Sequence, residues 1–258
     1  MTDLLERLRS PAHLPTTEEV RVVCESYSSK EESYGDDKTY LYNSVTRQDF
    51  ETLFPEWHAY EILTKEFIAS LSGYIASQIA KRGLKEPCTI LELGAGTGRL
   101  AHFLKRELEE RVPDRFSYHA TDNGSGEIPD QFGMVEPLDY AEALEKYKPN
   151  FVLVSWMPYE IDWSKTIRRT PTVEEYILIG EAGGCVGHEW ATWGDDTRLP
   201  FSRKRRMAPW LKDCFVLEPL REVSNLQVNR RSECEGTVVD RIRSRTFSFK
   251  RMRKNGAG

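Results

Sequence analysis

One short stretch of the sequence places an acidic residue beside three closely spaced glycines. It runs Thr89-Ile-Leu-Glu-Leu-Gly-Ala-Gly-Thr-Gly98, so an apolar run ends in Glu92 and glycines follow at alternate positions. Glycines allow a turn with φ > 0 and let a ligand approach bare backbone. The order predicts a strand, a tight turn and a helix, and open α/β sheets bind their ligands at such a carboxyl end.

The spacing of the glycines argues against a phosphate ligand at this turn. A dinucleotide site of the form G-x-G-x-x-G needs a glycine where Arg99 stands, and no P-loop pattern is present. A carboxylate beside the turn would repel a pyrophosphate, whereas it suits the ammonium of a zwitterionic amino acid. A glycine turn of another α/β protein is the alternative interpretation.

The pattern E-x-G-x-G-x-G closely resembles motif I of the class I S-adenosylmethionine (SAM) methyltransferases. The resemblance covers about residues 89–181 and implies SAM as the cofactor. It implies that the turn binds the methionine end of SAM through these residues: Glu92, Gly94, Ala95, Gly96, Thr97 and Gly98.

The resemblance also assigns cofactor contacts to the ends of the next two strands. Asp122 would accept hydrogen bonds from the ribose hydroxyls, with Asn123 beside it, although an aspartate here also suits a turn. Leu138 and Asp139 would contact the adenine, and Asp139 also suits the N-cap of the following helix.

The end of the fourth strand carries information about the methyl acceptor. In the family, enzymes that methylate amide or adenine nitrogens commonly have [DNS]-P-P-[YF] here, whereas this chain has Ser155-Trp-Met-Pro-Tyr159. The polar residue and the first proline of that motif are missing, which favours a small-molecule acceptor over a nucleic acid or a glutamine side chain. Ser155, Trp156 and Met157 are expected to line the cofactor, and Trp156 suits core packing equally well.

Three residues beyond the fourth and fifth strands are candidate catalytic groups. Tyr159 and Glu160 would face the substrate mouth, and His188 lies in a glycine-rich loop with Trp190 and Trp193 that would wall a pocket. A surface glutamate and a structural histidine are the commoner alternatives. His188-Glu189 lacks the second histidine of a zinc-protease motif, and we expect no metal.

The charge of −5 is unevenly distributed, because residues 198–258 carry 16 basic and 6 acidic residues. Arg241, Arg243 and Arg245 alternate, so they share one face of a strand, where they would contact nucleic acid or form a solvated face. Two alternatives to a small-molecule methyltransferase therefore stay open. One is an RNA or protein methyltransferase that uses this basic segment, and the other is a catalytically silent binding or regulatory protein.

The composition of the 258 residues is that of an ordinary globular protein. No apolar stretch reaches the roughly 18 residues that a membrane span needs, and the N-terminus has no signal-peptide apolar region. The five cysteines are odd in number and scattered, which argues against a disulfide framework and a structural zinc site. We expect a cytoplasmic (intracellular) protein without a membrane partner.

Apolar runs alternate with amphipathic segments and predict an α/β fold. We expect strands over 89–93, 117–122, 134–138, 151–156, 176–180, 215–228 and 237–250, and helices over 61–82, 99–112, 140–148 and 209–214. This predicts a Rossmann-like, seven-stranded, mostly parallel sheet with an antiparallel C-terminal strand pair and an N-terminal helical extension. Residues 1–83 would form the extension that covers cofactor and substrate, and residues 84–258 the SAM-binding domain.

Overall fold

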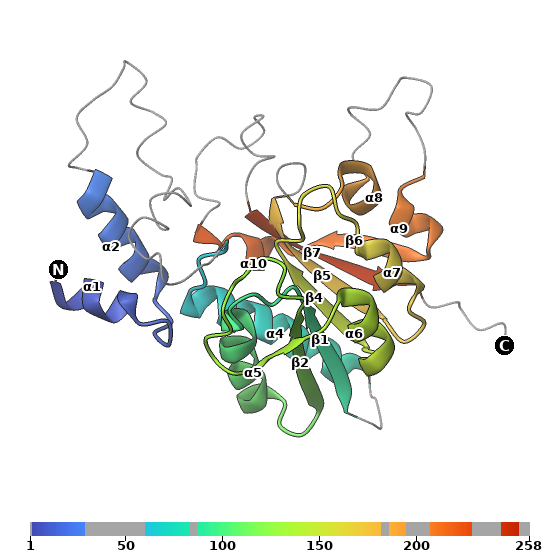
Figure 1. The fold of residues 1–258 in the computed structure, drawn as a ribbon, viewed down its shortest axis with the longest axis horizontal. Helices are drawn as coiled ribbons and strands as arrows, with labels where there is room; N and C mark the ends of the chain where they lie inside the picture. Colours follow the sequence, from blue (N-terminus) through green and yellow to red (C-terminus); the bar gives the residue numbers. More distant parts are fainter. Residues whose placement is uncertain are drawn as a thin grey trace, which may run out of the picture.

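The computed structural model describes residues 2–28, 60–82, 87–181, 186–194, 207–228 and 244–252, and its centre is a single sheet. The strands are β1 (Cys88–Leu93), β2 (Phe116–Asp122), β3 (Val135–Pro137), β4 (Phe151–Ser155), β5 (Glu175–Glu181), β6 (Phe215–Pro219) and β7 (Ser244–Arg251). The helices are α1 (Thr2–Arg9), α2 (Thr17–Ser28), α4 (Lys65–Arg82), α5 (Arg99–Arg111), α6 (Tyr140–Tyr147), α7 (Ser164–Arg169), α8 (Glu189–Trp193), α9 (Pro209–Lys212) and α10 (Arg221–Ser224). Figure 1 shows them around the sheet.

The sheet confirms the predicted α/β class. Its strand order is β3-β2-β1-β4-β5-β7-β6, and β7 runs antiparallel to both of its neighbours while the remaining pairs are parallel. The predicted antiparallel C-terminal pair is therefore present, with β7 placed between β5 and β6. Alternate residues of β4 face opposite sides: Phe151 and Leu153 belong to one core, and Val152 and Val154 to the other.

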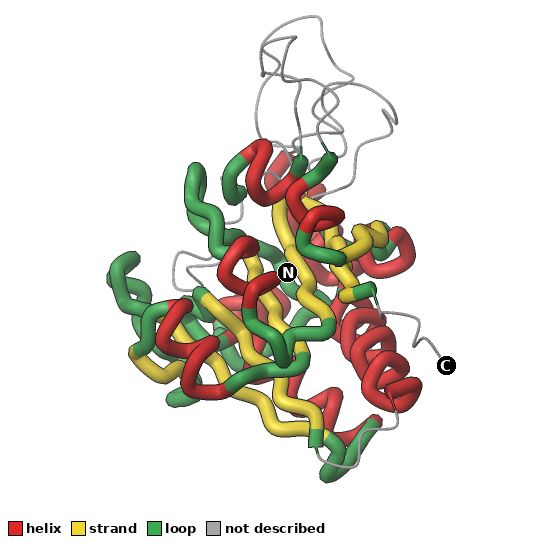
Figure 2. Tube along the Cα trace, turned by 90° about the vertical axis from the view of Figure 1, so that its right-hand side faces the viewer, coloured by secondary structure: helices red, strands yellow, loops and turns green. Residues whose placement is uncertain are grey.

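Helices cover both faces of the sheet, because its central strands are apolar on both sides. The first core packs α4, α5 and α10 against β1, β4 and β5. The second core packs α6, α7, α8 and the α9 residue Trp210 against the opposite face. Figure 2 shows the strands in yellow, flanked by helices in red.

Several predicted elements differ from the structure by one or two residues at an end, and two differ by more, each with a local cause. The helix predicted from 61 begins at Lys65, because the Thr64 hydroxyl accepts the backbone N–H of Phe67 at 3.2 Å and caps it. The strand predicted over 215–228 was wrong beyond Pro219, where the chain turns into α10. Residues 237–243, which include Arg241 and Arg243, lie outside the described part.

The N-terminal helices contact the sheet domain through backbone and buried polar groups. The guanidinium of Arg99, the first residue of α5, donates to the carbonyls of Pro11 and His13. The amide of Lys65 donates to the carbonyl of Pro15 at 2.8 Å. A small core joins α1 and α2 to Ile62. Within the described ranges, no helix is both long and apolar enough to cross a membrane.

Candidate functional site

The glycine turn after β1 is shaped by backbone conformations that disfavour side chains. Gly94 has φ +68, and a Cβ there would lie 3.1 Å from the indole ring of Trp163. Gly98 has φ +76 and is the N-cap of α5, with no side-chain cap on that helix. The turn is therefore a backbone surface that closes against an aromatic ring, with the first amides of α5 beside it.

Glu92 is buried below this turn. Its side chain is 1% exposed, and the Tyr118 hydroxyl donates to its Oε2 at 2.6 Å. Burial raises the pKa of Glu92 to about 7, the Tyr118 hydrogen bond lowers it, and the negative charge of Asp122 raises it. No ion pair reaches Glu92 from the residues the structure describes. An arriving cation would therefore favour its ionised form.

Asp122 lies at the end of β2 and is bound to the turn. Its Oδ2 accepts the amide of Gly96 at 3.0 Å, and its Oδ1 accepts the amide of Gly124 at 2.8 Å. Each carboxylate oxygen keeps further acceptor capacity, so two hydroxyl donors still fit. Asn123, by contrast, uses its Oδ1 on the amide of Ser125. Ala95 and Thr97 belong to the same turn, and the amide of Gln131 donates to the Thr97 carbonyl at 3.0 Å.

A second part of the crevice is aromatic and begins after β3. Asp139 is the N-cap of α6, because its Oδ1 accepts the amide of Ala141 at 2.9 Å, and Leu138 packs partly buried beside it. The next residue, Tyr140, stacks on Trp163 with ring centroids 5.2 Å apart. This pair offers an apolar flank next to the glycine turn.

The residues after β4 form the side of the crevice opposite β2. Ser155 ends the strand, and Trp156 follows with φ +57, while its backbone N–H donates to the Ile179 carbonyl at 2.8 Å. The ring of Trp156 is partly buried, and its Nε1 donates to Glu61 at 3.1 Å. Met157 is a core residue whose sulfur accepts the amide of Trp163 at 3.5 Å.

One backbone hydrogen bond brings the loop of Tyr159 and Glu160 next to His188, but no hydrogen bond or ion pair joins the three side chains in the described part of the chain. Tyr159 is 53% exposed, and Glu160 is also exposed, with its amide bonded to the Gly187 carbonyl at 3.0 Å. His188 is the N-cap of α8, because its Nδ1 accepts the amide of Ala191 at 3.2 Å. The expectation that Trp193 walls a pocket was wrong, since it is buried in the core against Phe247.

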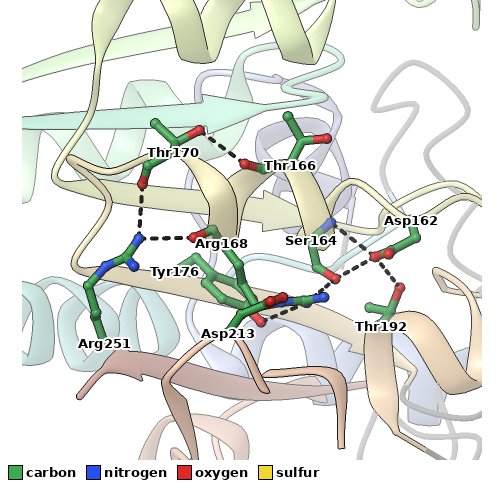
Figure 3. A network of polar contacts seen from close by, with 9 residues as sticks. All are labelled: Asp162, Ser164, Thr166, Arg168, Thr170, Tyr176, Thr192, Asp213 and Arg251. Atoms are coloured by element: carbon green, nitrogen blue, oxygen red, sulfur yellow. Dashed lines mark hydrogen bonds and ion pairs between the residues drawn. The ribbon is translucent and has the colours of Figure 1, made fainter. Parts of the chain in front are cut away.

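A buried polar network fixes the loop that carries these residues (Figure 3). Arg168 donates to Asp213 at 2.7 Å and to the Ser164 hydroxyl at 2.6 Å. Asp162 accepts from the Ser164 amide at 3.1 Å and from the Thr192 hydroxyl at 3.1 Å. Asp162 therefore connects α7 to α8. Within the described ranges, no cluster of metal-ligating side chains occurs.

Sequence reasoning missed three residues of the crevice: Glu61, Tyr118 and Trp163. Glu61 falls in the first turn of the helix predicted from the sequence. Tyr118 lies inside β2, and its contact with Glu92 depends on how β2 is aligned with β1. Trp163 is distant in sequence from Gly94, and only the fold brings them together. The spacing of a single sequence carries no signal for such contacts.

The glycine turn lies where the chain order of the strands reverses. From β1 the chain adds β2 and β3 on one side and then crosses to β4 on the other, and β7 alone is antiparallel. Open α/β sheets bind ligands at this switch point. The chain has the class I methyltransferase fold. This agrees with the resemblance inferred from the glycine turn.

Comparison with protein-family models and with curated proteins finds no match. Solved structures with a similar fold include the CurJ carbon methyltransferase, at 15% identity and a TM-score of 0.41, over 72% of this chain and 54% of that one. The magnesium protoporphyrin IX methyltransferase from Synechocystis PCC 6803 matches at 13% identity and a TM-score of 0.40, over 86% of this chain and 100% of that one.

The 23S rRNA methyltransferase ErmE is also similar, at 17% identity and a TM-score of 0.35, over 70% of this chain and 68% of that one. This chain spans about half of the length of the carbon methyltransferase. At such identities no substrate or residue role passes from these proteins to this chain.

Proposed function

We propose that this protein is a SAM-dependent methyltransferase that acts on a small-molecule acceptor. The observation that carries the proposal is the pair of carboxylates, Glu92 and Asp122, on either side of a glycine turn at the switch point of the sheet. When bound, SAM supplies an electrophilic methyl group on a positively charged sulfur.

The donor groups of the crevice match the parts of SAM. The amides of the turn would bind the carboxylate of the methionine part, and Glu92 its ammonium. Asp122 would accept from the ribose hydroxyls, as two further hydrogen bonds on oxygens that already accept amides. The aromatic pair of Tyr140 and Trp163 would flank the adenine, with Asp139 near its amino group.

The acceptor would lie beyond β4 and β5, against Trp156 and the exposed Tyr159. Aromatic walls and the missing [DNS]-P-P-[YF] pattern favour a small molecule. Most of the rate enhancement would come from holding the acceptor in line with the methyl group. The N-terminal segment, bound through Arg99 and Lys65, would cover the crevice as the extension comprising residues 1–83.

Calorimetric titration tests this proposal. We expect SAM and S-adenosylhomocysteine (SAH) to bind with micromolar affinity and NAD not to bind. Asp122→Ala should weaken both nucleosides about tenfold to a hundredfold, because it removes charge-assisted hydrogen bonds worth about 1.5–3 kcal/mol.

Glu107→Ala is the control. Glu107 is also a carboxylate that accepts a hydrogen bond, but its partner is Arg111 in an exposed pair near the end of α5, away from the glycine turn. Its removal should change the affinity much less than Asp122→Ala. NAD in place of SAM would overturn the proposal. Binding of SAM without transfer to a broad panel of acceptors would point to a regulatory protein on the same fold.

A further inference from the structure

A buried carboxyl group lies beside the crevice and takes no part in the cofactor contacts proposed above. Glu61 precedes α4 and is 5% exposed. Its Oε2 accepts from the Trp156 indole at 3.1 Å and from the Ser244 hydroxyl. Its Oε1 is buried and has no hydrogen-bond partner among the described residues. Leaving such an acceptor unsatisfied costs about 1–3 kcal/mol, so this atom requires an explanation.

The partners of Glu61 place it at the carboxyl edge of the sheet. Trp156 directly follows β4. Ser244 begins β7 and pairs with Glu181, the last residue of β5. Glu61 therefore lies over the ends of β4, β5 and β7, on the side of the switch point opposite Asp122. Under the proposed function this is the side on which the methyl acceptor would stand.

We propose that Glu61 accepts the proton that the methyl acceptor loses, an inference that rests on the proposed methyltransferase function. In that step the acceptor heteroatom forms a bond to the methyl carbon, and the carbon–sulfur bond breaks with its electron pair on sulfur. The acceptor proton moves to Oε1 of Glu61. Trp156 and Ser244 hold Oε2, so they orient the carboxylate and leave Oε1 for the proton.

The electrostatic surroundings of Glu61 suit this role. Burial raises its pKa to about 7, the donors Ser244 and Trp156 on Oε2 and the nearby side-chain amide of Gln227 lower it, and the negative charge of Glu181 raises it. Successive residues of β7 face opposite sides, so Arg245 projects away from the face that Ser244 presents to Glu61. A base whose pKa is near the working pH transfers protons efficiently.

A comparison of SAM with SAH tests the inference without knowledge of the acceptor. The two ligands differ only in the methyl group and the positive charge on sulfur. The inference places Glu61 close to the sulfonium, so a partly protonated Glu61 should ionise when SAM binds but not when SAH binds. Calorimetry near pH 7, in two buffers of different ionisation enthalpy, should show SAM releasing up to about half a proton more than SAH.

Glu61→Gln should abolish this difference in proton release, whereas Glu92→Gln is the matched control. Glu92 would contact the ammonium that both ligands share, so its loss should weaken both ligands similarly and preserve the difference between them. If Glu61→Gln does not fold, the variant Trp156→Phe tests the inference in its place. This variant removes one hydrogen-bond donor to Glu61, which raises the pKa of the carboxyl. The pH at which proton release differs most between SAM and SAH should therefore rise.

Three results would overturn the inference: equal proton release with SAM and SAH, a difference that survives in Glu61→Gln, or a pH maximum that Trp156→Phe does not move. Failure of both ligands to bind is a different result. It would remove the proposed function, and this inference with it.

Discussion

Buried carboxyl groups at the two ends of the sheet differ in their hydrogen-bond and ion-pair partners. At the amino end, Glu175 accepts from Arg82 at 3.1 Å, from the Tyr74 hydroxyl at 2.6 Å and from the Ser248 hydroxyl at 2.6 Å. At the carboxyl end, Glu61 and Glu92 are equally inaccessible, yet neither forms an ion pair with a described residue.

This difference separates stability from binding. Glu175 has the cation Arg82 and two hydroxyl donors, so the fold offsets part of the cost of burying its charge. Glu61 and Glu92 keep acceptor capacity that the described residues do not use. Burying these unpaired acceptors lowers the free energy of unfolding. Residues that lower stability in this way are expected at ligand sites, where the missing partner arrives with the ligand.

The largest effect on stability is expected from removing the ion pair at the amino end of the sheet. Arg82→Ala leaves Glu175 buried without its cation and should lower the free energy of unfolding by about 3–5 kcal/mol. Urea denaturation measures this change. Arg111→Ala is the control, since Arg111 forms only an exposed pair with Glu107 and its loss should cost less than about 0.5 kcal/mol. Similar losses for both variants would contradict the comparison.

A change of pH should act on the uncompensated end. The pKa values of Glu61 and Glu92 are about 7 in the fold, above the value of about 4.3 in unfolded chains. Between these values the native state holds more protons than the unfolded chain, so stability falls as the pH rises. The loss is on the order of 3 kcal/mol for each carboxyl.

Urea unfolding at several pH values between 5 and 8 measures this contribution. Glu61→Gln and Glu92→Gln remove a titrating group and should each flatten the decline. Both carboxyls would be ordinary compensated groups if the two variants kept the slope of the parent protein.

A smaller effect is expected from a variant that tests the contact between the glycine turn and Trp163. Gly94→Ala combines a positive φ with a Cβ 3.1 Å from Trp163, whereas Gly133→Ala has a similar φ of +63 and meets nothing within 4 Å. The shared backbone strain costs about 1–2 kcal/mol. Gly94→Ala should cost about 1 kcal/mol more and weaken SAM binding, while Gly133→Ala should bind SAM normally. Thermal unfolding and calorimetry compare the two variants.

The sequence predicted what depends on local pattern. The apolar runs predicted the strands, and the glycine spacing predicted the turn and its place on the sheet. The fold class and the antiparallel C-terminal pair followed from the order of these elements together with the family resemblance.

Other features depend on contacts between distant segments and could not be predicted in this way. The end of β6 was missed although Leu220 and Val223 stand three residues apart, a spacing that suits the short helix α10 better than a continued strand. For His188 the sequence left a base and a structural histidine open, and the structure adds that its Nδ1 caps α8, a role that a sequence position alone does not reveal. The partners of Glu61 lie 95 and 183 positions away along the chain.

The hydrogen bonds from Arg99 to the carbonyls of Pro11 and His13 have a consequence for the free molecule. The residue that starts α5, immediately after the glycine turn, also secures the amino-terminal segment. We expect this connection to couple the two parts, and reciprocity then makes the segment favour nucleoside binding as much as nucleoside binding favours the ordered segment. A nucleoside that orders the turn should slow proteolysis near the amino terminus, and deletion of that segment should shorten the lifetime of the complex.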